Sequence, residues 1–192
     1  AGRGRALTPT PIAAWAAERG LRVRRPENAN VPEELAEIHA VRADAYVVIA
    51  FGQKLSPALL GETFAINLHA SLLPAYRGAA PINWALIDGC DETGVSVIAL
   101  AQRMDAGVVY ATRTTAIRPT EDCGELHDRL AAMGPDVVLA TLGQFAAGTL
   151  LPMPQDESKV SKARKLAKED GRIDVTAASA RSLRGRIHGL TP

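Results

Sequence analysis

Asn67 and His69 are the two residues whose chemistry and spacing first suggest a reactive site. They lie two positions apart in an apolar stretch, so on an extended strand both side chains point to one face, while Ile66 and Leu68 point to the other. A carboxamide N–H and an imidazole directed at one point can stabilise the oxyanion that forms when a carbonyl is attacked. The alternative, from the residues alone, is an asparagine that caps a turn and a histidine whose nitrogens bind the backbone.

Asp105 is the next candidate, within Met104-Asp105-Ala106-Gly107. A carboxylate can orient a histidine, fix its tautomer and help to move a proton. An aspartate before a small residue and a glycine is also an ordinary turn former. The aspartate can serve Asn67 and His69 only if the strand ends that precede them lie side by side, and neighbouring parallel strands would bring that about.

The sequence around these residues predicts strands that alternate with helices. Apolar runs with β-branched residues predict buried strands over residues 46–50, 64–68 and 95–100, and a further strand is predicted over residues 108–117. Helical spacing with proline and glycine signals predicts helices between Thr10 and Gly20 and over residues 32–41, 79–87, 124–133 and 135–146. Residues 21–24 alternate apolar and basic side chains, which predicts a short strand. We therefore expect an open, mostly parallel α/β sheet with right-handed crossovers.

The composition excludes several classes of protein. The 192 residues, of which 47% are hydrophobic and 22% charged, suffice for one globular domain with a core. The longest apolar run, residues 45–51, is too short to cross a bilayer, and we expect no secretory leader. Two cysteines without CxxC spacing predict a reducing cytosol and no zinc site. Dinucleotide-binding, P-loop, serine-hydrolase and zinc-protease motifs are all missing from the sequence.

The charges are distributed unevenly along the chain. Residues 1–25 carry six arginines and one acidic residue, and residues 159–186 carry nine basic and three acidic side chains. The stretch between them has seven basic and seventeen acidic residues. Basic ends that flank an acidic body suit an enzyme that binds a polyanion, although solvated surface charge gives the same pattern.

Five short segments resemble a known family: Asn67-Leu68-His69, Ser71-Leu72-Leu73-Pro74, Tyr76-Arg77-Gly78-Ala79-Ala80-Pro81, Glu92-Thr93-Gly94-Val95 and Asp105-Ala106-Gly107. Together they resemble the 10-formyltetrahydrofolate-dependent formyltransferases. Residues 1–9 and 165–174 resemble the members of that family that act on a charged tRNA. The resemblance covers almost the whole chain, and it implies a Rossmann-like fold with helices on both faces of the sheet.

The resemblance also implies an activity and a set of site residues. A formyl group would pass from 10-formyltetrahydrofolate, the donor cosubstrate, to the amino group of methionyl initiator tRNA in translation initiation, with no metal. The implied catalytic residues are Asn67, His69 and Asp105. The implied binding residues are Ser71, Leu72, Leu73 and Pro74 for folate, Phe51, Gln53 and Leu55 for the pterin, and Arg3 and Arg5 for tRNA. For the three pterin residues, strand-end packing is the alternative.

Two departures from the family pattern bear on the organisation of the chain. We expect the chain to lack the strand that the family has before the basic loop, and to lack the C-terminal domain that would follow residue 192. We therefore expect residues 1–150 to form a partial catalytic domain and residues 151–192 to be a linker that leads to an absent second domain. The corresponding expectation is a monomeric, cytoplasmic protein without a membrane partner.

Two other functions stay open at this point. The same catalytic residues could formylate another amine, on an amino-sugar nucleotide or a glycinamide ribonucleotide, or could pass the formyl group to water. The chain could instead be a catalytically inactive fragment that binds folate or RNA. The basic residues near position 3 and the segment 165–174 favour the tRNA-directed transferase.

Overall fold

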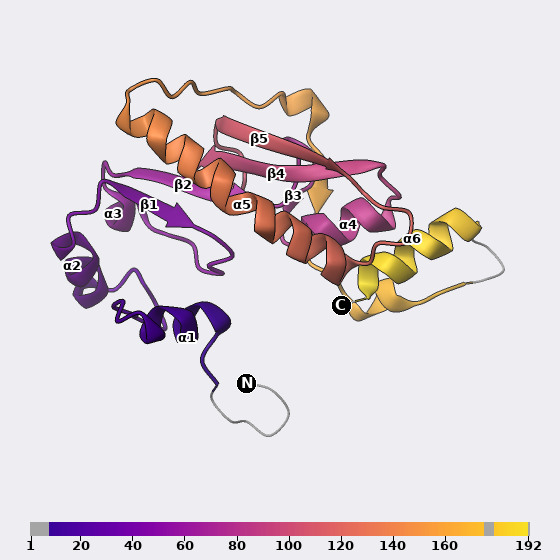
Figure 1. The fold of residues 1–192 in the computed structure, drawn as a ribbon, viewed down its shortest axis with the longest axis horizontal. Helices are drawn as coiled ribbons and strands as arrows, with labels where there is room; N and C mark the ends of the chain where they lie inside the picture. The colour runs from indigo at the N-terminus through magenta and orange to yellow at the C-terminus, as the bar shows by residue number, and fades with distance from the viewer. Residues whose placement is uncertain (1–7, 175–178, 192) are drawn as a thin grey trace. The chain divides into compact units, whose positions relative to one another are not determined.

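The computed structural model describes residues 8–174 and 179–191 (Figure 1). Within these residues the chain divides into two units. Unit 1 comprises the described residues up to 42 together with residues 53–61, and unit 2 comprises residues 43–52 together with those from 62 onward. No helix among the described residues is long and apolar enough to cross a membrane.

Unit 1 holds three short helices, α1 (Pro11–Glu18), α2 (Pro32–Ala40) and α3 (Pro57–Leu60). Each begins with a proline, whose fixed φ and missing N–H suit the first helical position. The predicted strand at residues 21–24 is wrong, because this segment has no strand partner. Its basic side chains bind α2 instead: Arg22 pairs with Glu37, and Arg24 donates to Glu34 at 2.8 and 2.7 Å.

Unit 2 is built on a four-stranded sheet in the order β1-β2-β4-β5. The strands are β1 (Ala45–Val48), β2 (Phe64–His69), β4 (Glu92–Ala99) and β5 (Val109–Ala116). The sheet is mixed and not mostly parallel, because β1 and β2 are parallel whereas β2–β4 and β4–β5 are antiparallel. The physical reason is clearest for β4 and β5, since the nine residues 100–108 between them are too few for the crossover that parallel strands need.

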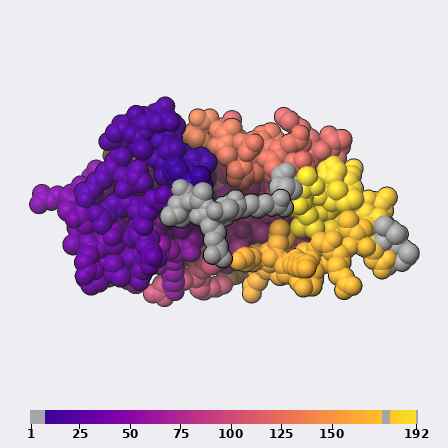
Figure 2. All heavy atoms as spheres, turned by 90° about the horizontal axis from the view of Figure 1, so that it is seen from below, coloured from indigo at the N-terminus to yellow at the C-terminus, as the bar shows by residue number. Residues whose placement is uncertain are grey.

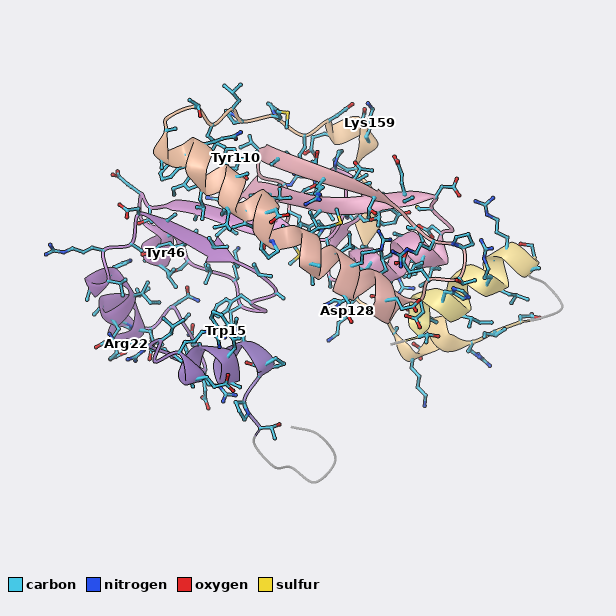
Figure 3. All side chains as sticks on the ribbon, in the orientation of Figure 1. Trp15, Arg22, Tyr46, Tyr110, Asp128 and Lys159 are labelled. Atoms are coloured by element: carbon cyan, nitrogen blue, oxygen red, sulfur yellow. The ribbon has the colours of Figure 1, made fainter. Side chains whose placement is uncertain are left out.

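One face of this sheet is apolar and is covered by two helices, α4 (Pro81–Ile87) and α5 (Cys123–Ala146) (Figure 1). Strand residues Ile66, Val95 and Val97 are buried there together with residues of both helices. Tyr110 packs against the same cluster (Figure 3). The opposite face carries the alternate residues of β2 and β4, so the assignment of Asn67 and His69 to the face opposite Ile66 and Leu68 is confirmed.

Helix α5 is continuous over 24 residues, so the predicted break between two helices at Gly134 and Pro135 is wrong. A Cβ on Gly134 would lie 2.5 Å from Leu68 Cδ2, which shows that the glycine permits close packing of the helix on β2. The buried contacts on both sides of Pro135 hold the helix together although the proline lacks an N–H.

The segment after residue 150 packs onto unit 2. Strand β6 (Lys162–Ala163) pairs in parallel with β3 (Arg77–Gly78), which follows β2 along the chain. Two short 3₁₀ helices, η1 (Glu157–Lys159) and η2 (Lys168–Gly171), flank β6. Helix α6 (Ala180–Leu190) packs on α4. The residues around position 170 and helix α6 lie side by side in Figure 2. Arg186 of α6 donates to the Asp170 carbonyl at 2.7 Å.

A buried ion pair joins the loop after β5 to α5. Glu121 is only 2% exposed, and it accepts hydrogen bonds of 2.7 Å from Nε and Nη2 of Arg129. Burial by itself raises the pKa of Glu121, but hydrogen bonds from Arg129 and from the Arg118 N–H outweigh it, so the pKa lies below its ordinary value. Such a carboxylate stabilises the fold above its unfolded pKa, and the stabilisation is lost as the pH falls through the folded pKa.

We expect Glu121→Gln to lower the free energy of unfolding at neutral pH by about 1.5 to 3 kcal/mol, the typical worth of hydrogen bonds to a charged group. The deficit should begin to shrink as the pH falls below the ordinary glutamate pKa of about 4.3, where the unfolded wild-type protein takes up a proton. It should vanish once the pH has fallen through the lowered pKa of the folded state, because the folded carboxylate is then protonated as well. Urea unfolding at neutral and acid pH measures the deficit and its dependence on pH. The matched control is Glu62→Gln, which changes an exposed glutamate. A deficit that is independent of pH would contradict the attribution of this stability to the ionised carboxylate of Glu121.

Candidate active site

His69 ends β2 on the polar face of the sheet and is buried, with 6% of its surface exposed. Its Nε2 lies 2.9 Å from the backbone oxygen of Tyr76. A carbonyl oxygen only accepts, so Nε2 carries the proton and donates. The Nδ1 edge of the ring faces the Asp105 carboxylate, and Nδ1 is 3.7 Å from Oδ1. This distance is too long for a direct hydrogen bond, but it allows one bridging molecule between the two groups, and it lets the carboxylate stabilise a protonated ring.

Asp105 reaches His69 by a route that differs from the predicted one. The strands β2 and β4 are antiparallel, so their carboxyl ends do not share an edge. The loop 100–108 carries Asp105 back to the end of β2, where its Oδ2 accepts the N–H of Gly78 at 2.9 Å. Asp105 itself has a φ of 54°, a left-handed conformation that an aspartate adopts only where its surroundings hold it.

Asn67 precedes His69 by two residues on the same face of β2 and is half-buried. It lies in register with Val48 of β1 and Ile98 of β4, so its backbone is held on both sides. Across residues 8–174 and 179–191, its carboxamide makes no hydrogen bond with another group of the protein. The amide is therefore available to a ligand, whereas the nitrogens of His69 face groups of the protein.

The segment Ser71–Pro74 forms a turn that is bound tightly to the sheet. Ser71 is fully buried and its Oγ donates to the Ala75 carbonyl at 2.6 Å. Ser96 of β4 donates to the Ser71 carbonyl at 2.7 Å and accepts the Leu73 N–H at 3.1 Å. Leu73 is buried with Ile98, and the peptide bond from Leu73 to Pro74 is cis. Of the four residues predicted to contact folate, Leu72 and Pro74 are the more accessible.

The three residues predicted for the pterin pocket are divided between the two units. Phe51 belongs to unit 2 and is 43% exposed. Gln53 and Leu55 belong to unit 1, where the Gln53 side chain accepts the Ala29 N–H at 2.9 Å and donates to the Pro26 carbonyl at 3.2 Å. Arg3 and Arg5, predicted to contact tRNA, lie outside the described residues.

Residues that are not among the predicted site residues hold the site together. Tyr76 supplies the carbonyl that binds His69, and its φ of 60° is again left-handed. Burial, together with hydrogen bonds to Cys90 and Asp88, raises the pKa of the Tyr76 phenol. Gln155, fifty positions after Asp105, donates to the Asp105 carbonyl at 2.8 Å. The motif that contains Tyr76 was visible in the sequence, whereas no periodicity or spacing pointed to Gln155.

The chemistry of the site resides in an amide and an imidazole–carboxylate pair on one sheet face. Among the described residues, no cluster of three or more histidine, cysteine or acidic side chains could hold a metal ion. The site can donate hydrogen bonds to an oxygen from Asn67, and it can bind or pass a proton between His69 and Asp105. These are the requirements of acyl transfer to an amine.

Comparison with known proteins agrees with this class of chemistry. A family model described as formyl transferase matches residues 1–142. The chain therefore belongs to the formyltransferase family. Among curated proteins, the methionyl-tRNA formyltransferases of Citrifermentans bemidjiense and Listeria monocytogenes are each 40% identical to it over the whole chain. The chain spans 60% and 62% of their respective lengths.

Solved structures share the fold at lower identity. HypX from Aquifex aeolicus, in complex with tetrahydrofolic acid, has a TM-score of 0.69 and 22% identity over 81% of this chain and 27% of its own. An N-formyltransferase from Helicobacter canadensis, in complex with folinic acid and dTDP-3-aminofucose, has a TM-score of 0.73 and 14% identity, covering 93% of this chain and 63% of its own. The expected α/β, Rossmann-like formyltransferase fold is thereby confirmed, with the mixed strand pairing described above.

Proposed function

We propose that this chain catalyses transfer of a formyl group from 10-formyltetrahydrofolate to the α-amino group of methionyl initiator tRNA. The observation that carries the proposal is the 3.7 Å approach of His69 Nδ1 to Asp105. The Asn67 amide, which has no hydrogen-bond partner among the described residues, lies on the same sheet face. The tRNA acceptor is supported by the names of the relatives that are 40% identical over the whole chain. Arg3 and Arg5 are proposed as tRNA contacts, and the cytoplasm as the compartment.

The reaction begins when the amine attacks the formyl carbon and forms a C–N bond, which moves the carbonyl electrons onto oxygen. Asn67 donates a hydrogen bond to this oxyanion, and His69 adds a second donor through Nδ1 when that nitrogen carries a proton. Asp105 stabilises the protonated ring and accepts, directly or through one water, the proton that the attacking amine loses. The carbonyl then re-forms, the bond to the folate nitrogen breaks, and that nitrogen takes up a proton.

Accessible apolar side chains near the end of β2 support folate as the donor. Leu72 and Pro74 of the turn after His69 are partly exposed and can contact a flat ring system, while Ser71 and Leu73 fix the turn from behind. Folate ligands in the structures with the same fold support a donor of this type. Phe51, Gln53 and Leu55 stay proposed pterin contacts.

Incubation with formyl-labelled 10-formyltetrahydrofolate and alternative acceptors tests the proposed activity. We expect label on methionyl initiator tRNA, with kcat/KM roughly 100-fold or more above that for an amino-sugar nucleotide or glycinamide ribonucleotide. Uncharged initiator tRNA is the matched control, because it lacks the α-amine. Label on the sugar nucleotide alone would support the alternative that structures with the same fold suggest. Release of formate without any labelled acceptor would contradict transfer.

A further inference from the structure

The side chain of Gln155 uses all of its hydrogen-bonding capacity around the loop that carries Asp105. Its Nε2 donates to the carbonyl of Asp105 at 2.8 Å and to that of Gly107 at 2.7 Å. Its Oε1 accepts from Nε and Nη2 of Arg77, at 2.9 and 2.8 Å. An amide has two N–H donors and two acceptor lone pairs, so all four are occupied. The Arg77 donors can be bound only by Oε1, and the carbonyls of Asp105 and Gly107 only by Nε2, so these partners determine which end of the amide carries the oxygen.

Arg77 and its two neighbours in sequence connect this amide to the side chains of His69 and Asp105. Its guanidinium is buried, with 6% of the side chain exposed, and it also binds Glu157 at 2.8 Å. The residue before it, Tyr76, binds His69 through its carbonyl. The residue after it, Gly78, donates its N–H to the Asp105 carboxylate. Three consecutive residues therefore hold the imidazole, the amide of Gln155 and the carboxylate.

The segment that contains Gln155 is fixed on both sides of that residue. Met153 exchanges two backbone hydrogen bonds of 2.8 Å with Val109 of β5. Further along, β6 pairs with β3, and Ser161 accepts the Arg77 N–H at 3.0 Å through its carbonyl. We call residues 153–163 the strap. Because both ends of the strap are attached to unit 2, Gln155 has a defined position from which to bind the Asp105 loop.

From this geometry we propose that Gln155 is a positioning residue for the formyl transfer described above, and that it acts by holding Asp105 at its distance from His69. The inference rests on the proposed function for its catalytic meaning. Asp105 has a left-handed backbone, which costs free energy and persists only where contacts enforce it. The two hydrogen bonds from Gln155 are the contacts that bind the backbone carbonyls of Asp105 and Gly107. The Gly78 N–H therefore donates to the carboxylate of a residue whose backbone Gln155 holds in place.

The kinetic test uses substitutions that keep the volume of the side chain. Gln155→Glu and Gln155→Met both remove the N–H donors, and we expect each to lower kcat by roughly 10- to 100-fold, the cost of a displacement of about 1 Å in a catalytic group. The KM values for folate and tRNA should stay close to wild type, because Gln155 contacts neither substrate in this proposal. Gln144→Glu and Gln144→Met, on the exposed surface of α5, are the matched controls. Wild-type kcat in both Gln155 variants would overturn the inference.

Amide hydrogen exchange tests the positioning role without any activity. In the Gln155 variants we expect the Gly78 N–H, which donates to Asp105, to exchange about tenfold faster, as for the loss of roughly 1.4 kcal/mol of local protection. The neighbouring Ala79 N–H, which donates to Ala163 at 2.8 Å, should keep its protection. Equal acceleration at both amides would mean general loosening of β3 and would overturn a specific role. Absence of formyl transfer in the wild type would refute the proposed function, and the exchange result would still decide whether Gln155 holds Asp105.

Discussion

Asp105→Asn should lower kcat/KM for formyl transfer by on the order of 100- to 10,000-fold, the range that general acid–base groups contribute. The substitution keeps the size of the side chain, and the amide oxygen can still accept the Gly78 N–H. The negative charge beside His69 Nδ1 is lost, together with the group that accepts the proton of the amine. Steady-state formylation of methionyl-tRNA measures the loss, and folate titration shows whether donor binding survives, as we expect.

The control for this variant is Asp136→Asn, which removes a carboxylate that is 76% exposed and pairs with Arg113 on the surface of α5. Its kcat/KM should equal that of the wild type. If Asp105→Asn were also as active as the wild type, the carboxylate would have no part in proton transfer. The mechanism above would then have to be abandoned, whatever the fold of the chain.

Asn67→Ala should reduce kcat by roughly 100- to 1,000-fold, the usual cost of removing one donor to an oxyanion. The free energy of unfolding should hardly change, because the described part of the chain provides no hydrogen-bond partner that the substitution would leave unpaired. Single-turnover transfer and urea unfolding, measured on the same preparations, separate the two effects. Asn67→Asp, which keeps the shape but removes the N–H donors, should lose activity to a similar extent.

Two results for Asn67→Ala would contradict the proposed role of the amide. Turnover close to wild type would show that the amide does not bind the oxyanion. A large loss of stability in the variant would show that Asn67 has a structural contact, and the loss of activity would then be explained without catalysis.

The sequence predicts the elements whose pattern is local. Strand β2 is predicted over residues 64–68 and spans Phe64–His69, because the alternation of apolar and polar side chains from Ile66 to His69 specifies both the strand and its two faces. The side of the sheet on which Asn67 and His69 lie follows from the same alternation. Helices α2 and α4 begin at prolines that mark their first turns in the sequence.

Features that depend on tertiary packing were not predictable in this way. The glycine and proline at positions 134 and 135 are normally helix-breaking, yet α5 continues because the glycine lets the helix approach Leu68. Strand direction depends on how a connection is folded and is not encoded in the apolar pattern of the strand. Gln155 lies in a polar stretch without periodicity, so only the folded chain reveals its contacts with Asp105.

The parallel pairing of β3 with β6 has a consequence for how such proteins can be recombined. The matched family region ends at residue 142, whereas the amide that binds the Asp105 loop and the strand that supports Arg77 come later in the chain. A chimera joined at residue 142 would combine the N-terminal part of one enzyme, which includes β3, with the supporting strand β6 of another. A junction after residue 163 keeps both halves of this support from a single parent.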